Sequence, residues 1–175
     1  GSKITLLQAF AIHVDQLRPR STGCIKLKSA DAYDKPAMYF KYLADPHDLD
    51  ELVEGVRKTR ELVAQSAFDE FRGAEMIQGP NVRTHSEVRD WVRSVVTTDF
   101  HPCGTCRMGH GPDAVVDDRF RVHGLEGLRV VDASVIPQIM SANMNAPTQM
   151  IASRAADYIL GTPQLSPLEA RFAFQ

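Results

Sequence analysis

The apolar and polar positions in the N-terminal part of the chain predict an antiparallel sheet. Residues 3–14 are mostly apolar and rich in β-branched and aromatic side chains, and residues 22–29 alternate between apolar and polar ones. Both patterns are typical of β-strands. A shorter apolar stretch at residues 37–42 is consistent with a third strand, so we expect an antiparallel meander here.

Two helices are predicted next, each by a local start signal. Asp45 can cap a helix and Pro46 suits its first position, and apolar residues then recur at helical spacing. Thr84 and Glu87 are three residues apart, as in a capping box. We expect this second helix to end near Thr97.

The C-terminal part combines loops with a short strand and a helix. Polar and small residues dominate positions 98–111, whereas the apolar run 128–132 predicts a strand that ends in a carboxylate. Pro147 opens a predicted helix and Gly161 ends it, because proline favours the first turn and glycine the C-terminus. Together with the sheet, these helices predict the α+β fold class.

Composition and charge exclude several classes of function. The 175 residues are 43% hydrophobic and carry 20 Lys and Arg against 22 Asp and Glu, a net charge of −2. This balance supplies no positive field for a polyanion, so nucleic-acid binding is disfavoured.

No run of the sequence reaches the roughly 18 apolar residues that a membrane span needs. Three cysteines suit a reducing compartment, and Gly1–Ser2 resembles a cloning scar.

A dense polar cluster between the second helix and the strand contains candidate chemistry. His101, Cys103, Cys106 and His110 offer four donors that zinc accepts, although closed zinc sites usually take their second pair from a distant segment. Cys103 and Cys106 also have dithiol spacing, but redox pairs begin a helix after a strand. Haem attachment would need a histidine where Arg107 stands. Cysteines of this kind are most often small buried hydrophobes.

Two further segments bear on phosphate and anion binding. Residues 109–114 match the dinucleotide fingerprint in letters only, because neither the preceding strand nor the following helix is predicted. Residues 141–148 place two asparagines directly before the last helix, whose unpaired N–H groups make an anion site. Alternatively, Asn145 or Thr148 only caps that helix, and the spacing does not decide between these readings.

Taken in order, these motifs resemble the C-terminal part of the glucose-methanol-choline (GMC) family of FAD oxidoreductases. The matching stretches are His101–Gly109, Val115–Asp117, Arg121–Ser134 and Asn143–Pro147. Features upstream extend the resemblance across residues 16–161. Within the family, the chain is most similar to the bacterial choline dehydrogenases.

The resemblance implies roles for two side chains at a catalytic centre. The family's catalytic histidine corresponds to His101, which would take the proton of the substrate hydroxyl while hydride passes from the alcohol carbon to flavin N5. Imidazole suits this step because its ordinary pKa of about 6.5 lets it exchange a proton near neutral pH. The partner position is Asn143, whose amide can donate to a developing alkoxide oxygen and cannot titrate.

The same resemblance implies where FAD would bind, and no metal site is expected. Asp132 and Ala133 would lie near the ribityl and diphosphate part of the cofactor. The last helix would aim its positive end at the N1 and C2 oxygen region of the flavin. The residues expected along the flavin ring are Asn145, Ala146, Pro147 and Thr148.

The resemblance also implies that the chain is a fragment. Family members begin with a glycine-rich unit for the ADP half of FAD, and none precedes Lys3. We therefore expect the N-terminal FAD-binding portion of the same protein as a partner, and expect the fragment alone neither to retain FAD tightly nor to turn over. Residues 3–98 would belong to the substrate-binding domain, 99–161 to the catalytic loop and FAD domain, and 162–175 to a mobile tail.

The expected substrate is a small primary alcohol, with choline implied by likeness only. Other family members oxidise different alcohols or sugars, as dehydrogenases or as oxidases, and these alternatives stay open. A zinc-binding interaction module is the rival from another class. The expected location is the cytoplasm, with peripheral association at the inner membrane in the full enzyme.

Overall fold

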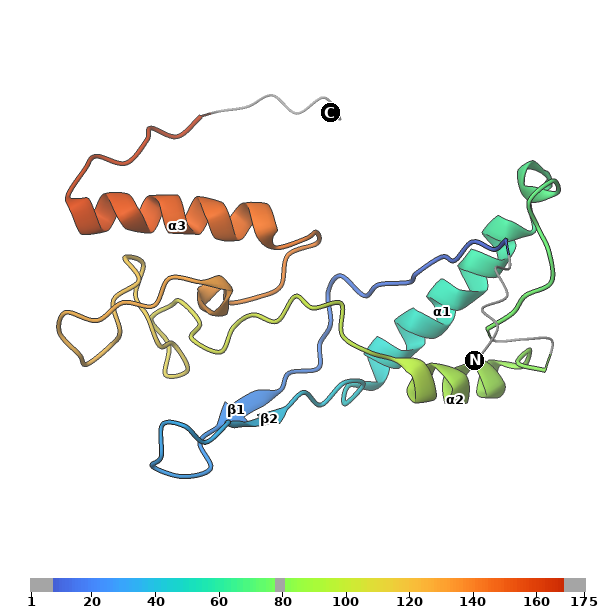
Figure 1. Ribbon diagram of the computed structural model, residues 1–175, viewed down its shortest axis with the longest axis horizontal. Coiled ribbons are helices and arrows are strands. Elements are labelled where there is room, and N and C mark those ends of the chain that lie inside the picture. The colour runs from blue at the N-terminus through green and yellow to red at the C-terminus, as the bar shows by residue number, and fades with distance from the viewer. Residues whose placement is uncertain (1–7, 78–80, 169–175) are drawn as a thin grey trace, which may run out of the picture. The chain divides into compact units, whose positions relative to one another are not determined.

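The computed structural model describes residues 8–77 and 81–168, and the chain divides into two compact units after Asp99 (Figure 1). The fold class is α+β, as predicted: helices accompany a small antiparallel sheet. No helix within the described ranges is long and apolar enough to cross a bilayer. In chain order the elements are β1 (Cys24–Lys26), β2 (Ala37–Tyr39), α1 (Pro46–Val63), a 3-10 turn η1 (Ser66–Phe68), α2 (His85–Val95), a 3-10 turn η2 (Ala133–Val135) and α3 (Asn145–Leu160).

The sheet of the first unit is the hairpin of β1 and β2. The strands pair antiparallel, with Cys24 opposite Tyr39. They lie inside the predicted ranges 22–29 and 37–42, but each is three residues long. The alternation at residues 22–29 and the apolar stretch at residues 37–42 therefore located the two strands but overestimated their length.

The prediction of a strand at residues 3–14 is wrong for residues 8–14, the part of this range that the structure describes. Residues 8–14 are irregular, and residues 3–7 lie outside the described part of the chain. An extended segment becomes a strand only when a neighbour pairs with its backbone N–H and C=O groups. No strand among the described residues does so here.

Both predicted helices of the first unit begin at their start signals. The Asp45 carboxylate accepts a hydrogen bond from the backbone N–H of His47 at 2.9 Å and caps α1. The capping box of α2 is complete: Glu87 N–H donates to the Thr84 hydroxyl oxygen, and the Glu87 carboxylate accepts from Thr84 N–H. Helix α2 ends at Val95, shortly before its predicted end.

The core of the first unit lies between α1 and α2, which pack against each other. Apolar side chains three and four residues apart share one face of a helix, so each helix contributes one stripe. The side chains buried between them are Leu49, Val53, Val56, Val88 and Val92. The single tryptophan, Trp91, packs at the edge of this cluster.

A buried carboxylate fastens the irregular segment before β1 to the start of α1. Asp48 is 1% exposed, and its two oxygens accept from Gln16 Nε2 at 2.9 Å, Arg20 N at 2.9 Å and Ser21 N at 2.8 Å. Burial opposes ionisation, but these hydrogen bonds outweigh it and lower the pKa of Asp48. The Ser21 hydroxyl accepts from Asp45 N–H, which closes the junction.

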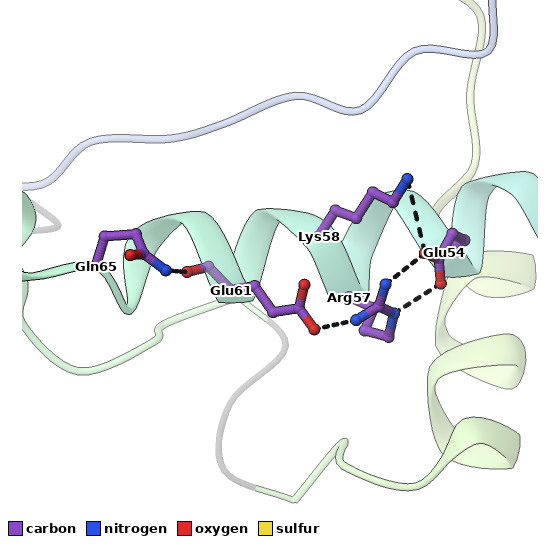
Figure 2. A network of polar contacts seen from close by, with 5 residues as sticks. All are labelled: Glu54, Arg57, Lys58, Glu61 and Gln65. Carbon is purple, nitrogen blue, oxygen red and sulfur yellow. Dashed lines mark hydrogen bonds and ion pairs between the residues drawn. The ribbon is translucent and has the colours of Figure 1, made fainter.

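The solvent side of α1 carries a chain of polar contacts (Figure 2). Arg57 donates to Glu54 through Nε at 2.7 Å and pairs with Glu61 one turn further on. Lys58 lies 3.8 Å from Glu54, and the Gln65 amide donates to the backbone oxygen of Glu61. Solvent and salt screen exposed ion pairs of this kind, so this face adds little to stability.

The second unit has its own small core beneath α3. Val116, Phe120, Val135 and Ala155 form a buried cluster, and the Phe120 ring lies 6.3 Å from the Tyr158 ring of α3. Most of this unit is loop, as Figure 1 shows in yellow and orange. Its few buried side chains therefore have to order long stretches of irregular backbone.

The strand predicted at residues 128–132 does not form. Only an isolated bridge joins Arg121 to Arg129, although Val130 and Val131 pack against the core as expected of an apolar run. The apolar pattern correctly predicted burial, but no parallel or antiparallel neighbour extends along this segment in the described residues.

Helix α3 begins at Asn145, two residues before the predicted start at Pro147. A proline is tolerated there because the first N–H groups of a helix have no partner within it. The end is as predicted: Gly161 adopts φ +69°, a left-handed conformation that favours glycine.

In the segment expected to be a mobile tail, the Gln164 amide donates to the backbone oxygen of Arg154. Residues 169–175 lie outside the described part of the chain.

Candidate functional site

The loop that contains the predicted catalytic histidine is anchored to η2 by its second half. Cys106 N–H donates to Ser134 O at 3.0 Å, and Met108 N–H donates to Val135 O at 2.9 Å. The Arg107 guanidinium adds a bond to Pro137 O at 3.3 Å. The loop therefore runs alongside the segment that directly follows Asp132 and Ala133.

The stretch of the same loop from His101 to Thr105 is not anchored in this way. Among the described residues, nothing forms a hydrogen bond with any residue from His101 to Thr105. His101 is half-buried and Pro102 is exposed, and Gly104 turns the chain at φ +84°. The backbone hydrogen bonds that join this loop to η2 begin at Cys106, five residues after His101.

The loop cysteines are free thiols and do not form part of a metal site. Both are half-buried, and burial raises the pKa of the Cys103 thiol. Within the described ranges, no three His, Cys, Asp or Glu side chains lie close enough to hold a metal ion. The zinc alternative at His101, Cys103, Cys106 and His110 is therefore not supported.

The two residues expected near the ribityl and diphosphate part of FAD lie at the start of η2. Asp132 is exposed, and its Oδ1 accepts from Ser134 N–H at 2.7 Å, which caps the turn. Ala133 is half-buried. The hydrogen bond from Cys106 to Ser134 ties these residues to the histidine loop, a contact between segments that are far apart in the sequence.

The start of α3 is open to an anionic group. Met144 occupies the N-cap, and no side chain in the described part of the chain caps the helix. The Thr148 hydroxyl instead donates to Met144 O at 2.7 Å, while Asn145 and Ala146 are exposed. Their N–H groups and the positive helix end fit the electron-rich edge of a flavin ring.

The predicted site residues thus fall on three segments of the second unit. The backbone bonds bring the His101 loop and Asp132–Ala133 together. Asn143 is exposed and lies just before the α3 N-terminus. His101 and Asn143 do not form a hydrogen bond with each other.

The sequence analysis did not single out the polar residues that hold the turn after the His101 loop. Asp117 pairs with Arg121 at 2.7 Å and accepts from the backbone N–H groups of Arg119 and Arg121. Partial burial opposes ionisation, but these bonds outweigh it and lower the pKa of Asp117 to about 2. His123 Nε2 lies 2.9 Å from Gly109 O. The signal available in the sequence was an aspartate four residues before an arginine, Asp117 and Arg121, which can form an ion pair.

Comparison with known proteins identifies the class to which this fold and site belong. The family model described as GMC oxidoreductase matches residues 19–152, so the chain belongs to the GMC oxidoreductase family. Among curated relatives, it is 46% identical over 165 residues to the oxygen-dependent choline dehydrogenase of Chromohalobacter salexigens, covering 94% of this chain and 30% of that protein. The corresponding enzyme of Escherichia coli O45:K1 is 44% identical over 98% of this chain and 31% of its own.

Solved structures agree with this assignment. Pyridoxine 4-oxidase from Mesorbium loti superposes with a TM-score of 0.77 at 29% identity, over 85% of this chain and 29% of that one. Aspergillus oryzae formate oxidase gives a TM-score of 0.78 at 31% identity, over 83% and 26% of the two chains. The present chain spans about 30% of the length of the curated relatives that it matches.

Proposed function

We propose that this chain supplies the catalytic loop and one flavin-contacting segment of an FAD-dependent alcohol dehydrogenase of the choline dehydrogenase type. Membership of the GMC family and the 46% identity to a choline dehydrogenase support this proposal. The observation that carries it is the pair of backbone bonds from Cys106 and Met108 to Ser134 and Val135. They hold the histidine loop beside the segment expected to contact FAD.

In the proposed reaction His101 is the base. Bound FAD supplies an acceptor for the hydride that leaves the alcohol carbon. The His101 imidazole takes the proton of the substrate hydroxyl, and the Asn143 amide donates a hydrogen bond to the oxygen on which negative charge develops. Because an amide does not titrate, His101 is the only acid or base of the pair.

The proposed cofactor contacts come from the start of α3 and the start of η2. Asn145 and Ala146 would place N–H groups along the flavin ring, followed by Pro147 and Thr148, and the positive end of α3 would favour negative charge there. Asp132 and Ala133 would lie near the ribityl and diphosphate part. These residues alone are too few to retain FAD tightly.

The proposed partner is therefore an N-terminal FAD-binding portion, and the proposed substrate is a small primary alcohol such as choline. In this scheme residues 3–98 belong to the substrate-binding domain and residues 99–161 complete the FAD domain. The proposed location is the cytoplasm, with the full enzyme peripherally bound at the inner membrane. The similarity to two choline dehydrogenases supports the substrate class.

A chimera tests this function directly. The N-terminal part of the Chromohalobacter salexigens relative is joined to this chain in place of its own C-terminal third, and choline, pyridoxine and an aryl alcohol are offered as substrates. We expect choline oxidation, lowered about 100–10,000-fold by His101→Ala and about 100–1,000-fold by Asn143→Ala, with flavin absorbance retained. The matched control is His110→Ala, an exposed histidine of the same loop. Undiminished turnover in His101→Ala would rule out the assigned role.

A further inference from the structure

We propose that Cys103 and Cys106 are a redox modification site, at which a disulfide reversibly clamps the loop of His101. The modification stands on the loop structure alone, whereas its effect on turnover rests on the function proposed above. The two thiols are separated only by Gly104 and Thr105. Both are half-buried and neither is engaged in a disulfide or a metal site in the described part of the chain.

The backbone around the two thiols is anchored unequally. Cys106 is fixed through its N–H to Ser134 O, while the stretch from His101 to Thr105 has no hydrogen bond in the described residues. Cys103 can therefore move toward Cys106 without breaking any backbone bond. Gly104, already at φ +84°, provides the turn between them, because glycine tolerates such conformations.

The two thiols differ in their expected order of reaction. Burial raises the pKa of Cys103 and reduces the share of thiolate that an oxidant can meet. With a hydroperoxide as oxidant, the Cys106 thiolate attacks the O–O bond and becomes a sulfenic acid, releasing water after protonation. The Cys103 sulfur then attacks the Cys106 sulfur and its proton leaves with the hydroxyl as a second water. Two thiols lose two electrons, and hydrogen peroxide is reduced to two waters.

Closing this bond would constrain the base. A disulfide holds its two Cα atoms within about 7 Å, so it ties Cys103 to the anchored Cys106 and restricts the positions open to His101, two residues upstream. A displacement of about 1 Å in a catalytic group can cost about 100-fold in rate. We therefore expect the oxidised form to turn over at least about tenfold more slowly.

The chemical step is tested on the 175-residue chain with hydrogen peroxide, by thiol titration and intact mass. We expect the free thiols to fall from three to one with loss of two hydrogens, and to return with dithiothreitol. Cys24→Ser is the matched control, since Cys24 is the remaining half-buried free thiol and its replacement should leave the pairing intact. In Cys106→Ser, Cys103 should keep its thiol. Sulfinic acid at Cys106 with Cys103 still reduced, or dimers linked through Cys24, would overturn the proposal.

The effect on function is tested in the chimera described above. Oxidation should lower choline turnover at least about tenfold, and dithiothreitol should restore it. In Cys106→Ser, the turnover rates of the peroxide-treated and the reduced protein should be nearly equal. A thiol pair that closes without changing turnover would remove the regulatory role and leave the modification. A reduced chimera without turnover would contradict the proposed function, while the thiol titration would still decide the modification.

Discussion

Replacing Asp48 by asparagine should cost the first unit much of its stability. The carboxylate accepts three hydrogen bonds from the segment before β1 while almost fully buried. An asparagine keeps one acceptor oxygen, but its NH2 group must face either Ser21 N–H or the donors from Gln16 and Arg20. One charge-assisted bond is lost, worth about 1.5–3 kcal/mol, and a buried N–H is left unpaired at about 1–3 kcal/mol. Because the two costs overlap, we expect about 3 kcal/mol.

Trp91 makes the measurement specific to this unit. It is the only tryptophan and packs against the α1–α2 core, so its fluorescence reports unfolding there. With an m-value of about 2 kcal/mol/M, the urea midpoint should fall by about 1.5 M. The matched control is Asp50→Asn, also on α1, which removes an exposed ion pair to Arg89 of α2 and should cost at most about 1 kcal/mol. Equal midpoints for the two variants would refute the reasoning.

The pH dependence of the free energy of unfolding of Asp48→Asn tests the same buried carboxylate. A folded-state pKa below its ordinary value means that the carboxylate stabilises the fold above the unfolded pKa, about 4, and that this contribution is lost as the pH falls below it. Asparagine removes the titration. The stability difference between wild type and variant should therefore shrink as the solution is acidified from pH 6 toward about pH 3.

Three further substitutions test separate parts of the fold. Asp117→Asn should flatten the fall in stability of the second unit between about pH 4 and pH 2, because the folded pKa of this Arg121-paired carboxyl is about 2; far-UV circular dichroism across that range would reveal it. Gly23→Ala should destabilise the hairpin by about 1–3 kcal/mol, since an added Cβ would lie 2.1 Å from Tyr39 O; urea unfolding would measure this. Thr84→Ala removes the cap of α2 and should cost about 1 kcal/mol by the same Trp91 assay.

The predictable parts of the fold are those specified by neighbouring residues. A helix start depends on a cap within three residues, so Asp45 and Thr84 located α1 and α2 correctly. A strand depends on a partner that can lie anywhere in the chain. The runs 8–14 and 128–132 have apolar patterns but lack an extended partner among the described residues, so both predicted strands were wrong.

The candidate site shows the same division. The types and spacing of His101, Asn143 and the residues around Pro147 could be read from the sequence through a family resemblance. The bonds from the histidine loop to Ser134 and Val135 could not, because they join backbone groups whose side chains carry no pattern for such a contact. Asp117 was missed for a related reason: its role in bracing the turn depends on backbone N–H groups as much as on Arg121.

The looseness of the His101 stretch makes stability and catalysis separable at this residue. The side chain is half-buried and has no hydrogen bond among the described residues, so His101→Ala removes little packing and leaves no buried polar group unpaired. Substitutions of this kind usually change stability by less than about 0.5 kcal/mol. The variant chain should therefore unfold in urea at the wild-type midpoint when followed by far-UV circular dichroism. A clear drop would mean that the imidazole braces the loop, and the rate loss expected in the chimera would then no longer report proton transfer.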